Sequence, residues 1–251
     1  MENFLEVRNL MVFFENALAV NDFSMTVNKG EIVGVLGSNS AGKSTLMNTI
    51  SGLIIDIKIK EARRGGERIT VLGDVLLEGE SIINLKPAER VKKGIVLARE
   101  RHPVFAESSV MENLRIAGYI CKGKEYEQNL ELVFHIFPRL KDLAKRKGGL
   151  LSGGEQQMLI IGMALIAKPR LLLLDEPLLG LAPAIQHDLM AAVVNIRKTT
   201  GITIVVTEQF ARPLLPIIDR GYVLENGMLC LTGTRQELMD NPEVISAYFG
   251  V

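Results

Sequence analysis

Short unbroken runs of valine, isoleucine and leucine recur along the chain, and they restrict its possible folds more than any other feature. Several of these runs do not alternate with polar residues, which is the pattern of strands buried on both faces of a parallel sheet. The predicted strands are residues 31–36, 94–98, 171–174, 202–207 and 222–224. Helical patterns follow the first, third and fourth strands, so the sequence predicts an α/β fold built from βα units. The dipeptide Asn226-Gly227 predicts a hairpin between two short C-terminal strands.

The segment directly after the first predicted strand has the pattern of a phosphate-binding loop, and a helical run follows it. Backbone N–H groups of such a loop, together with the helix N-terminus behind them, hold phosphate groups. Lys43 is expected to reach the terminal phosphates from a solvent-facing loop, and the Ser44 hydroxyl is expected to bind Mg²⁺. The predicted phosphate-binding residues are Gly37, Ser38, Asn39, Ser40, Ala41, Gly42, Lys43, Ser44 and Thr45.

Two carboxylates, Asp175 and Glu176, follow the four-leucine strand at 171–174. At the carboxyl end of a parallel strand beside a phosphate loop, Asp175 can hold Mg²⁺ directly or through water. Glu176 then suits the role of a base that positions water for attack on a γ-phosphate. The plainer alternative is a strand that simply ends in polar turn residues before Pro177.

A third motif precedes the apolar helical run at 158–167. Ser152 and Glu155 have the spacing of a helix capping box. The glycines at 153 and 154 would fall in the first helical turn, where each is worse than alanine by about 1 kcal/mol. Two such penalties are reasonable where a phosphate approaches the positive end of the helix. The motif comprises Leu151, Ser152, Gly153, Gly154, Glu155, Gln156 and Gln157.

The order of these motifs resembles that of ATP-binding-cassette (ABC) ATPases, because LSGGEQQ lies downstream of the phosphate loop and upstream of LLLLDEP. The resemblance spans almost the whole chain. More narrowly, the segments FPRL, LSGGEQQML, PRLLLLDEP, LGLAP, TEQ and DRGYVLENG resemble ATPase subunits of branched-chain amino-acid importers, of the type that carries glutamine in place of the switch histidine. The implied fold is a P-loop NTPase of the ABC ATPase type: a RecA-like mixed sheet, an N-terminal antiparallel β subdomain and an inserted helical lobe.

The resemblance also implies a division of the single domain at 1–251. The α/β core with its β subdomain would comprise 1–102 and 150–251, and the helical lobe would comprise 103–149, just before the signature motif at 151–157. Between Gly52 and Leu72 the chain is longer than is usual in the family. At residues 54–60, isoleucines alternate with charged residues, which predicts an extra or extended strand with one solvent-exposed face.

Several residue roles follow from the resemblance by position. Phe14 matches the aromatic that stacks on adenine, although a plain strand or core residue is the alternative. Glu100 falls where most cassettes have a glutamine that senses the γ-phosphate and Mg²⁺. Gln209 falls at the switch-histidine position and joins Glu176 in the predicted catalytic pair; its amide can donate a hydrogen bond but cannot take a charge near neutral pH. Ala182 stands where many cassettes have aspartate. Ser40 stands where cassettes usually have glycine.

The implied cofactors are ATP and Mg²⁺. ATP would lie between the phosphate loop of one chain and the signature motif of its partner, which is a sister ABC ATPase or a second copy. Membrane permease subunits and, through them, an extracytoplasmic solute-binding protein complete the expected assembly. The alternatives are importers of urea or short-chain amides, a cassette exporter, and a non-transport cassette protein. A GTPase is disfavoured, because the sequence NKGE at 28–31 precedes the loop and ends in the wrong residue for guanine recognition.

Charge and hydropathy set the expected location. The chain has 29 Lys and Arg against 29 Asp and Glu. This zero balance argues against nucleic acid as the main partner. The longest wholly apolar run covers residues 158–167 only, whereas a membrane-spanning helix needs about 20 residues. We therefore expect a peripheral protein at the cytoplasmic face of the membrane, with no transmembrane segment of its own.

Overall fold

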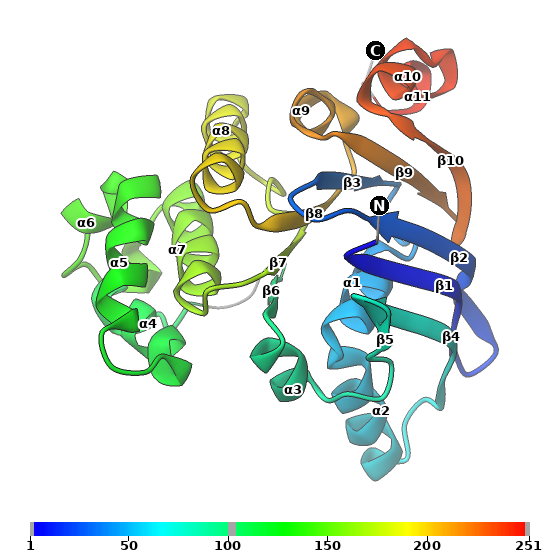
Figure 1. The fold of residues 1–251 in the computed structure, drawn as a ribbon, viewed down its shortest axis with the longest axis horizontal. Helices are drawn as coiled ribbons and strands as arrows, with labels where there is room; N and C mark the ends of the chain where they lie inside the picture. Colours follow the sequence, from blue (N-terminus) through cyan, green and yellow to red (C-terminus); the bar gives the residue numbers. More distant parts are fainter. Residues whose placement is uncertain (1–2, 100–103, 249–251) are drawn as a thin grey trace.

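The computed structural model describes residues 3–99 and 104–248, which fold around two β-sheets (Figure 1). The first sheet is antiparallel and has the strand order β2-β1-β4-β5. Its strands are β1 (Leu5–Phe14), β2 (Ala17–Val27), β4 (Ile69–Leu77) and β5 (Glu80–Ser81). This sheet confirms the N-terminal antiparallel β subdomain.

The second sheet contains all five strands that the apolar runs predict, with boundaries shifted by one or two residues. Its order is β10-β9-β3-β8-β7-β6; β10 runs antiparallel to β9 and the other pairs are parallel, so the sheet is mixed. The Asn226-Gly227 turn joins β9 to β10, with positive φ at both residues as a two-residue hairpin turn of type I′ requires. The strands are β3 (Ile32–Leu36), β6 (Ile95–Ala98), β7 (Leu171–Asp175), β8 (Thr203–Glu208), β9 (Arg220–Glu225) and β10 (Met228–Thr234).

The leucine run of β7 shows why the central strands are apolar at every position. Successive side chains of a strand point to opposite faces of the sheet. Leu171 and Leu173 belong to the core shared with the antiparallel sheet, whereas Leu172 and Leu174 belong to the core shared with the helices on the other face. All four are fully buried. The central sheet therefore needs apolar residues on both faces and separates two hydrophobic cores.

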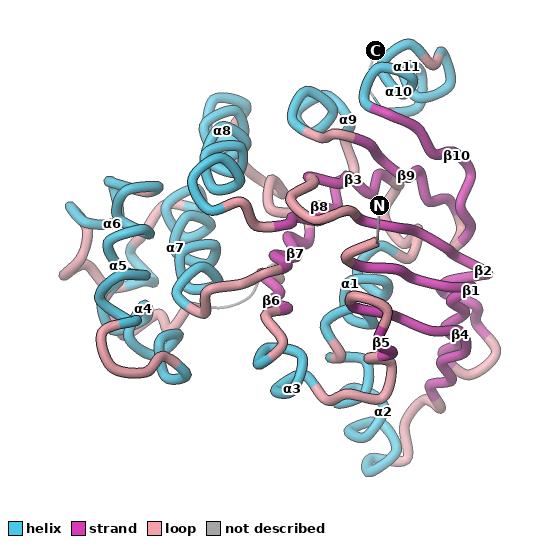
Figure 2. The backbone as a smooth tube through the Cα atoms, in the orientation of Figure 1, coloured by secondary structure: helices cyan, strands magenta, loops and turns pink. Residues whose placement is uncertain are grey.

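Helices cover both faces of this sheet, as Figure 2 shows. On the side of the antiparallel sheet lies α1 (Lys43–Ser51), and α2 (Leu53–Arg64) and α3 (Pro87–Lys92) pack beside it. The remaining helices build the other core or its edge. They are α4 (Val110–Ala117), α5 (Glu125–Ile136), α6 (Pro138–Asp142), α7 (Gly153–Ile166), α8 (Pro183–Thr200), α9 (Ala211–Leu214), α10 (Arg235–Asp240), α11 (Pro242–Tyr248) and the short 3₁₀ turns Gly118–Ile120, Gly148–Leu150 and Leu215–Ile217.

Residues 104–149, the described part of the predicted helical lobe, are helical, with one isolated bridge between Ser109 and Lys147 and no named strand. Helices α4, α5 and α6 of this segment pack against α7. The division of the chain into a core and a lobe stays a prediction.

The predicted extra strand at 54–60 is wrong, because these residues belong to α2. In a strand, the isoleucines that alternate with charged residues would all share one face of the sheet. In the structure Ile54 is buried and Ile57 is half-buried against the core, whereas Ile59 faces solvent. Packing of one helical face against α1 and α3 therefore decides the conformation. The helix ends at Gly65 in a left-handed conformation.

Among the helices that the structure describes, none is both long and apolar enough to cross a membrane.

Candidate active site

The predicted phosphate loop connects β3 to α1 at the carboxyl edge of the six-stranded sheet. The Gly37 N–H donates to the Glu208 carbonyl at 3.2 Å, which ties the start of the loop to the end of β8. Glycine is needed at both ends of the loop: a Cβ on Gly37 would lie 2.4 Å from the Leu224 carbonyl oxygen, and a Cβ on Gly42 would lie 2.4 Å from that of Ala19. Gly42 also has φ 104°, a left-handed conformation that permits the turn into α1.

Ser40 lies within this loop with φ 64°. This left-handed conformation costs an ordinary side chain about 1 kcal/mol. The usual glycine of the family at this position therefore has a conformational reason, and this chain carries serine there at a small cost.

Lys43, the first residue of α1, is buried rather than solvent-facing, which corrects the sequence-based expectation. Only 3% of its surface is exposed. Its ammonium donates to the Gly37 carbonyl at 2.7 Å and the Ser38 carbonyl at 2.8 Å, and it lies 2.9 Å from Glu176 Oε1. The side chain thus folds back over its own loop, where two carbonyls and one carboxylate compensate its desolvation.

Asp175 ends β7 beside the start of α1. Its Oδ1 accepts a hydrogen bond from the Thr207 hydroxyl at 2.8 Å and a longer one from the Ser44 hydroxyl at 3.3 Å. Burial raises the pKa of Asp175, and the two hydroxyl donors partly oppose this shift. A carboxylate and a hydroxyl that meet in this way offer hard oxygen ligands, which suit Mg²⁺. The described residues contain no cluster of three metal-ligating side chains; Mg²⁺ commonly binds with one or two protein groups and keeps its waters.

Glu176 begins the turn after β7 with φ 46°, in the left-handed region. Its backbone N–H donates to the Thr207 carbonyl at 3.2 Å and to the Thr207 hydroxyl at 3.1 Å. Its side chain is 8% exposed and pairs with Lys43. The structure therefore brings the phosphate loop, Asp175 and Glu176 together, as the sequence predicts.

Two residues at this site, Thr207 and Glu208, do not appear among the sequence-predicted ones. Both end the buried strand β8 and are almost fully buried. Glu208 Oε1 accepts a hydrogen bond from the Leu178 N–H at 2.9 Å, and burial raises the pKa of this carboxyl to about 8. The signal that could have revealed them is two polar residues in succession after an apolar strand beside the phosphate loop.

The predicted signature motif caps α7. Ser152 Oγ accepts a hydrogen bond from the Glu155 N–H and the Glu155 carboxylate accepts one from the Ser152 N–H, which confirms the capping box. A Cβ on Gly154 would lie 2.5 Å from the Ile185 side chain of α8, so this glycine has a packing reason within the chain. Gly153 is exposed and has no such contact below 3.4 Å. Only Gly153 thus remains open to a ligand's close approach.

Helix α7, which begins in the signature motif, and α1, which follows the phosphate loop, lie on opposite faces of the six-stranded sheet (Figure 1). Among the described residues, no hydrogen bond or ion pair joins residues 151–157 to residues 37–45. Within the described residues of one chain, the two motifs therefore have no direct polar contact.

The remaining predicted residues lie around the site or outside the described chain. Phe14 ends β1 and is half-buried against the core. In the hairpin of β1 and β2, Ala19 of β2 lies close to Gly42 of the phosphate loop. Gln209 follows β8 and is half-buried. Ala182 caps α8. Glu100 lies outside the residues that the structure describes.

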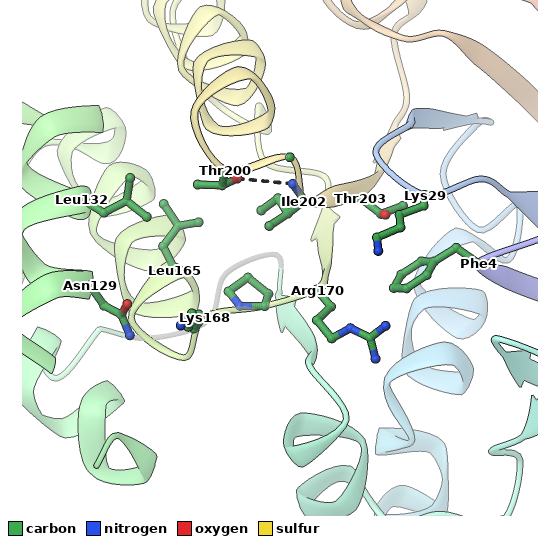
Figure 3. Close-up of a pocket in the computed structure, with 12 residues that line it drawn as sticks. Phe4, Lys29, Asn129, Leu132, Leu165, Lys168, Arg170, Thr200, Ile202 and Thr203 are labelled. Atoms are coloured by element: carbon green, nitrogen blue, oxygen red, sulfur yellow. Dashed lines mark hydrogen bonds between the residues drawn. The ribbon is translucent and has the colours of Figure 1, made fainter. Parts of the chain in front are cut away.

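A cavity of about 640 Å³ lies elsewhere, at the amino ends of β7 and β8 (Figure 3). Lys29, Lys168 and Arg170 line it together with apolar side chains of α5 and α7. The Arg170 guanidinium stacks over the Phe4 ring at 5.3 Å. Because the phosphate loop and both carboxylates lie at the carboxyl ends of the strands, this cavity is separate from the candidate active site.

A phosphate loop, a strand ending in two carboxylates and a glycine-containing helix cap on this mixed sheet define an ABC-type P-loop ATPase. Comparison with known families agrees: residues 20–179 match the ABC transporter family. The chain belongs to this family and is an ATPase that powers a transporter.

Several relatives cover nearly the whole chain. The branched-chain amino-acid transport ATP-binding protein BraG of Pseudomonas aeruginosa is 38% identical over 98% of this chain and 99% of its own. The probable branched-chain amino-acid transport ATP-binding protein LivF of Archaeoglobus fulgidus is 34% identical, with 92% of each chain covered. The lipopolysaccharide export ATP-binding protein LptB of Haemophilus influenzae is 29% identical over 98% of this chain and 97% of its own.

Solved structures show the same fold. An ABC transporter ATP-binding cassette in its ADP conformation superposes over 100% of both chains, with 29% identity and a TM-score of 0.83. The recognition of an ABC ATPase from the sequence motifs is therefore confirmed.

Proposed function

We propose that this protein is the ATP-hydrolysing subunit of a membrane importer for branched-chain amino acids. The observation that carries the ATPase site is the meeting of Lys43, Ser44, Asp175 and Glu176 at the carboxyl edge of the six-stranded sheet. The likeness to BraG over nearly the full length of both chains supports the choice of solute. The lower identity to the exporter subunit LptB makes an export role the weaker candidate.

The phosphate loop would hold the ATP phosphates through its backbone N–H groups and Lys43. Ser44 and Asp175 would hold Mg²⁺, which when bound neutralises phosphate charge and polarises the γ-phosphoryl group. Phe14 would stack on adenine, and Glu100 and Gln209 would sense the γ-phosphate.

Glu176 would orient and deprotonate the attacking water. Its carboxylate lies 2.9 Å from the Lys43 ammonium. When a phosphate oxygen takes that place on Lys43, the Glu176 carboxylate becomes available to the water. This exchange couples nucleotide binding to the readiness of the base.

A second chain would complete the site; the position of α7 across the sheet from α1 supports this. Residues 151–157 would contact the γ-phosphate of ATP bound to a sister ATPase, and the sister's motif would do the same here. Closure on ATP and reopening after hydrolysis would drive permease subunits at the cytoplasmic face of the membrane, with a solute-binding protein delivering the amino acid outside.

The partner is expected to be a sister chain rather than a second copy. Gln209 and Ala182 depart from the usual histidine and aspartate, and a homodimer would carry both departures at both sites. ATPase rates of this chain, of the sister and of their mixture test the point across a range of concentrations. An isolated chain that dimerises with ATP and hydrolyses it as fast as the mixture would favour the homodimer.

The solute is tested by uptake in cells that lack the gene. Labelled leucine uptake is expected to fall and to return with the parent protein but not with the Glu176→Gln variant. Unchanged leucine uptake together with lost uptake of urea or short-chain amides would overturn the proposed solute and leave the ATPase assignment intact.

A further inference from the structure

Glu208 is a buried carboxyl group to which the proposed mechanism gives no role. It is the last residue of β8 and 4% exposed. Its backbone and its side chain make different contacts. The backbone carbonyl accepts a hydrogen bond from the Gly37 N–H at 3.2 Å, and the side-chain Oε1 accepts one from the Leu178 N–H at 2.9 Å. Glu208 therefore touches both the start of the phosphate loop and the turn that follows the two carboxylates.

The turn Glu176-Pro177-Leu178 has only two backbone donors, because proline has no N–H. The Glu176 N–H donates to Thr207, and the Leu178 N–H donates to the Glu208 side chain. The last two residues of β8 thus accept every backbone donor of this turn. A shift of β8 or loss of the Glu208 carboxyl would leave the Leu178 N–H without its acceptor.

Anchoring matters here because Glu176 has a strained backbone. A non-glycine residue at φ 46° persists only where its surroundings hold it in place. The same backbone orientation directs the Glu176 carboxylate to Lys43. Release of Leu178 would let the turn relax and move the carboxylate.

We propose that Glu208 is a positioning residue, which fixes the Glu176 turn through Leu178 and so supports the rate of hydrolysis without contributing to ATP affinity. The inference rests on the proposed role of Glu176 as the base. Burial favours the neutral form of the Glu208 carboxyl. Glutamine keeps an oxygen acceptor at the same reach and is also neutral, so it should replace glutamate here.

The experiment compares Glu208→Gln and Glu208→Leu in the complex with the sister ATPase. Leucine removes the acceptor and leaves the buried Leu178 N–H without a partner, so kcat should fall by about 10-fold, the usual scale for one such group. The KM for ATP and the ATP affinity measured without Mg²⁺ should stay within about 3-fold. Glutamine should keep kcat within about 3-fold of the parent.

A matched control lies at the other end of the same strand. Thr203 is also buried, and its hydroxyl accepts the Gly30 N–H at 3.0 Å, far along β8 from Glu176. Thr203→Val should lower the unfolding temperature without lowering kcat. An equal kcat loss in Thr203→Val and Glu208→Leu would show a general effect of a weakened strand and overturn the proposal.

Two further variants keep the test decisive. If Glu208→Leu does not fold, Glu208→Asp retains a carboxyl but shortens its reach, and its kcat should fall below that of Glu208→Gln. In a Glu176→Gln background, Glu208→Leu should cause no further loss of kcat. Unchanged kcat in folded Glu208→Leu, with Glu176→Gln inactive, would reject the positioning role alone; an active Glu176→Gln would reject the base assignment itself.

Discussion

Two buried cations lie at opposite ends of α1, and only one of them lies at the candidate active site. Lys43 begins the helix and bonds two loop carbonyls and the Glu176 carboxylate. Arg90 reaches the other end from α3 and is fully buried. Its guanidinium donates to the carbonyls of Thr49, Ile50, Leu85 and Ile83 at 2.6 to 2.9 Å. Burial lowers the pKa of Arg90 to about 10, so it stays charged near neutral pH.

The difference lies in the partners. Arg90 donates to backbone carbonyls at the end of α1 and in the loop between β5 and α3, and no charged partner of it is described. Arg90 therefore has no described anionic partner that a phosphate could replace. Lys43 pairs with a carboxylate whose place a phosphate oxygen can take. Burial of a cation therefore does not indicate function by itself; the role proposed for Lys43 rests on its anionic partner.

The largest expected effect is on the structural cation. Arg90→Met should lower the free energy of unfolding by about 3 to 5 kcal/mol, because four carbonyls lose a charged donor within the protein. Urea denaturation measures the loss. Lys92→Met, an exposed position of the same helix, is the control and should change stability by less than about 0.5 kcal/mol. A similarly small change in the free energy of unfolding for Arg90→Met would contradict the structural role of Arg90.

The matching substitution of Lys43, at the other end of α1, should affect ATP binding rather than stability. Lys43→Met should weaken ATP binding by at least about 100-fold, as loss of a buried charged partner does, while the protein stays folded. Calorimetry with ATP measures the affinity, and Lys58→Met on the exposed part of α2 serves as control. Unaltered ATP affinity in a folded variant would contradict the role of Lys43.

Removal of the exchangeable partner separates binding from turnover. Glu176→Gln should leave ATP affinity within a few-fold and lower turnover by about 100-fold, the scale for loss of a positioned base. Steady-state hydrolysis with the sister ATPase present tests this. Equal turnover in the variant and the parent would exclude Glu176 as the base.

The smallest effect concerns pH and the buried carboxyl near Lys43. Unfolded Glu208 releases its proton near pH 4.5, whereas the folded protein keeps it to about pH 8. The folded state binds more protons between these values, so parent stability should fall as pH rises from 4.5 to 8 and then level off. Relative to Glu208→Gln, which does not titrate there, the free energy of unfolding of the parent should decrease across this pH range. A difference that does not change with pH would contradict the buried neutral carboxyl.

Much of the fold and of the site was predictable from the sequence. The five central strands were visible because a strand buried on both faces must be apolar throughout. The phosphate loop was visible because glycines and a lysine at fixed spacing serve a backbone turn at a helix start. The Ser152 and Glu155 spacing predicted the cap of α7, since capping depends on residues three apart. These features depend on local geometry and need no information about distant neighbours.

Other features depended on which segments meet in space. The isoleucines of α2 suit a strand or a helix, and contact with α1 and α3 decided for the helix. Gly154 suggested an approaching phosphate, but Ile185 of α8 occupies that space.

The sequence by itself determined the class of this protein: its strand pattern, its phosphate loop and the carboxylates that end β7. The tertiary structure alone decided that Lys43 is buried against Glu176, that Glu208 anchors Leu178, and that α7 lies across the sheet from α1. The physical reason is distance along the chain. A local motif follows from neighbouring residues, whereas these contacts join residues that lie from 30 to more than a hundred positions apart.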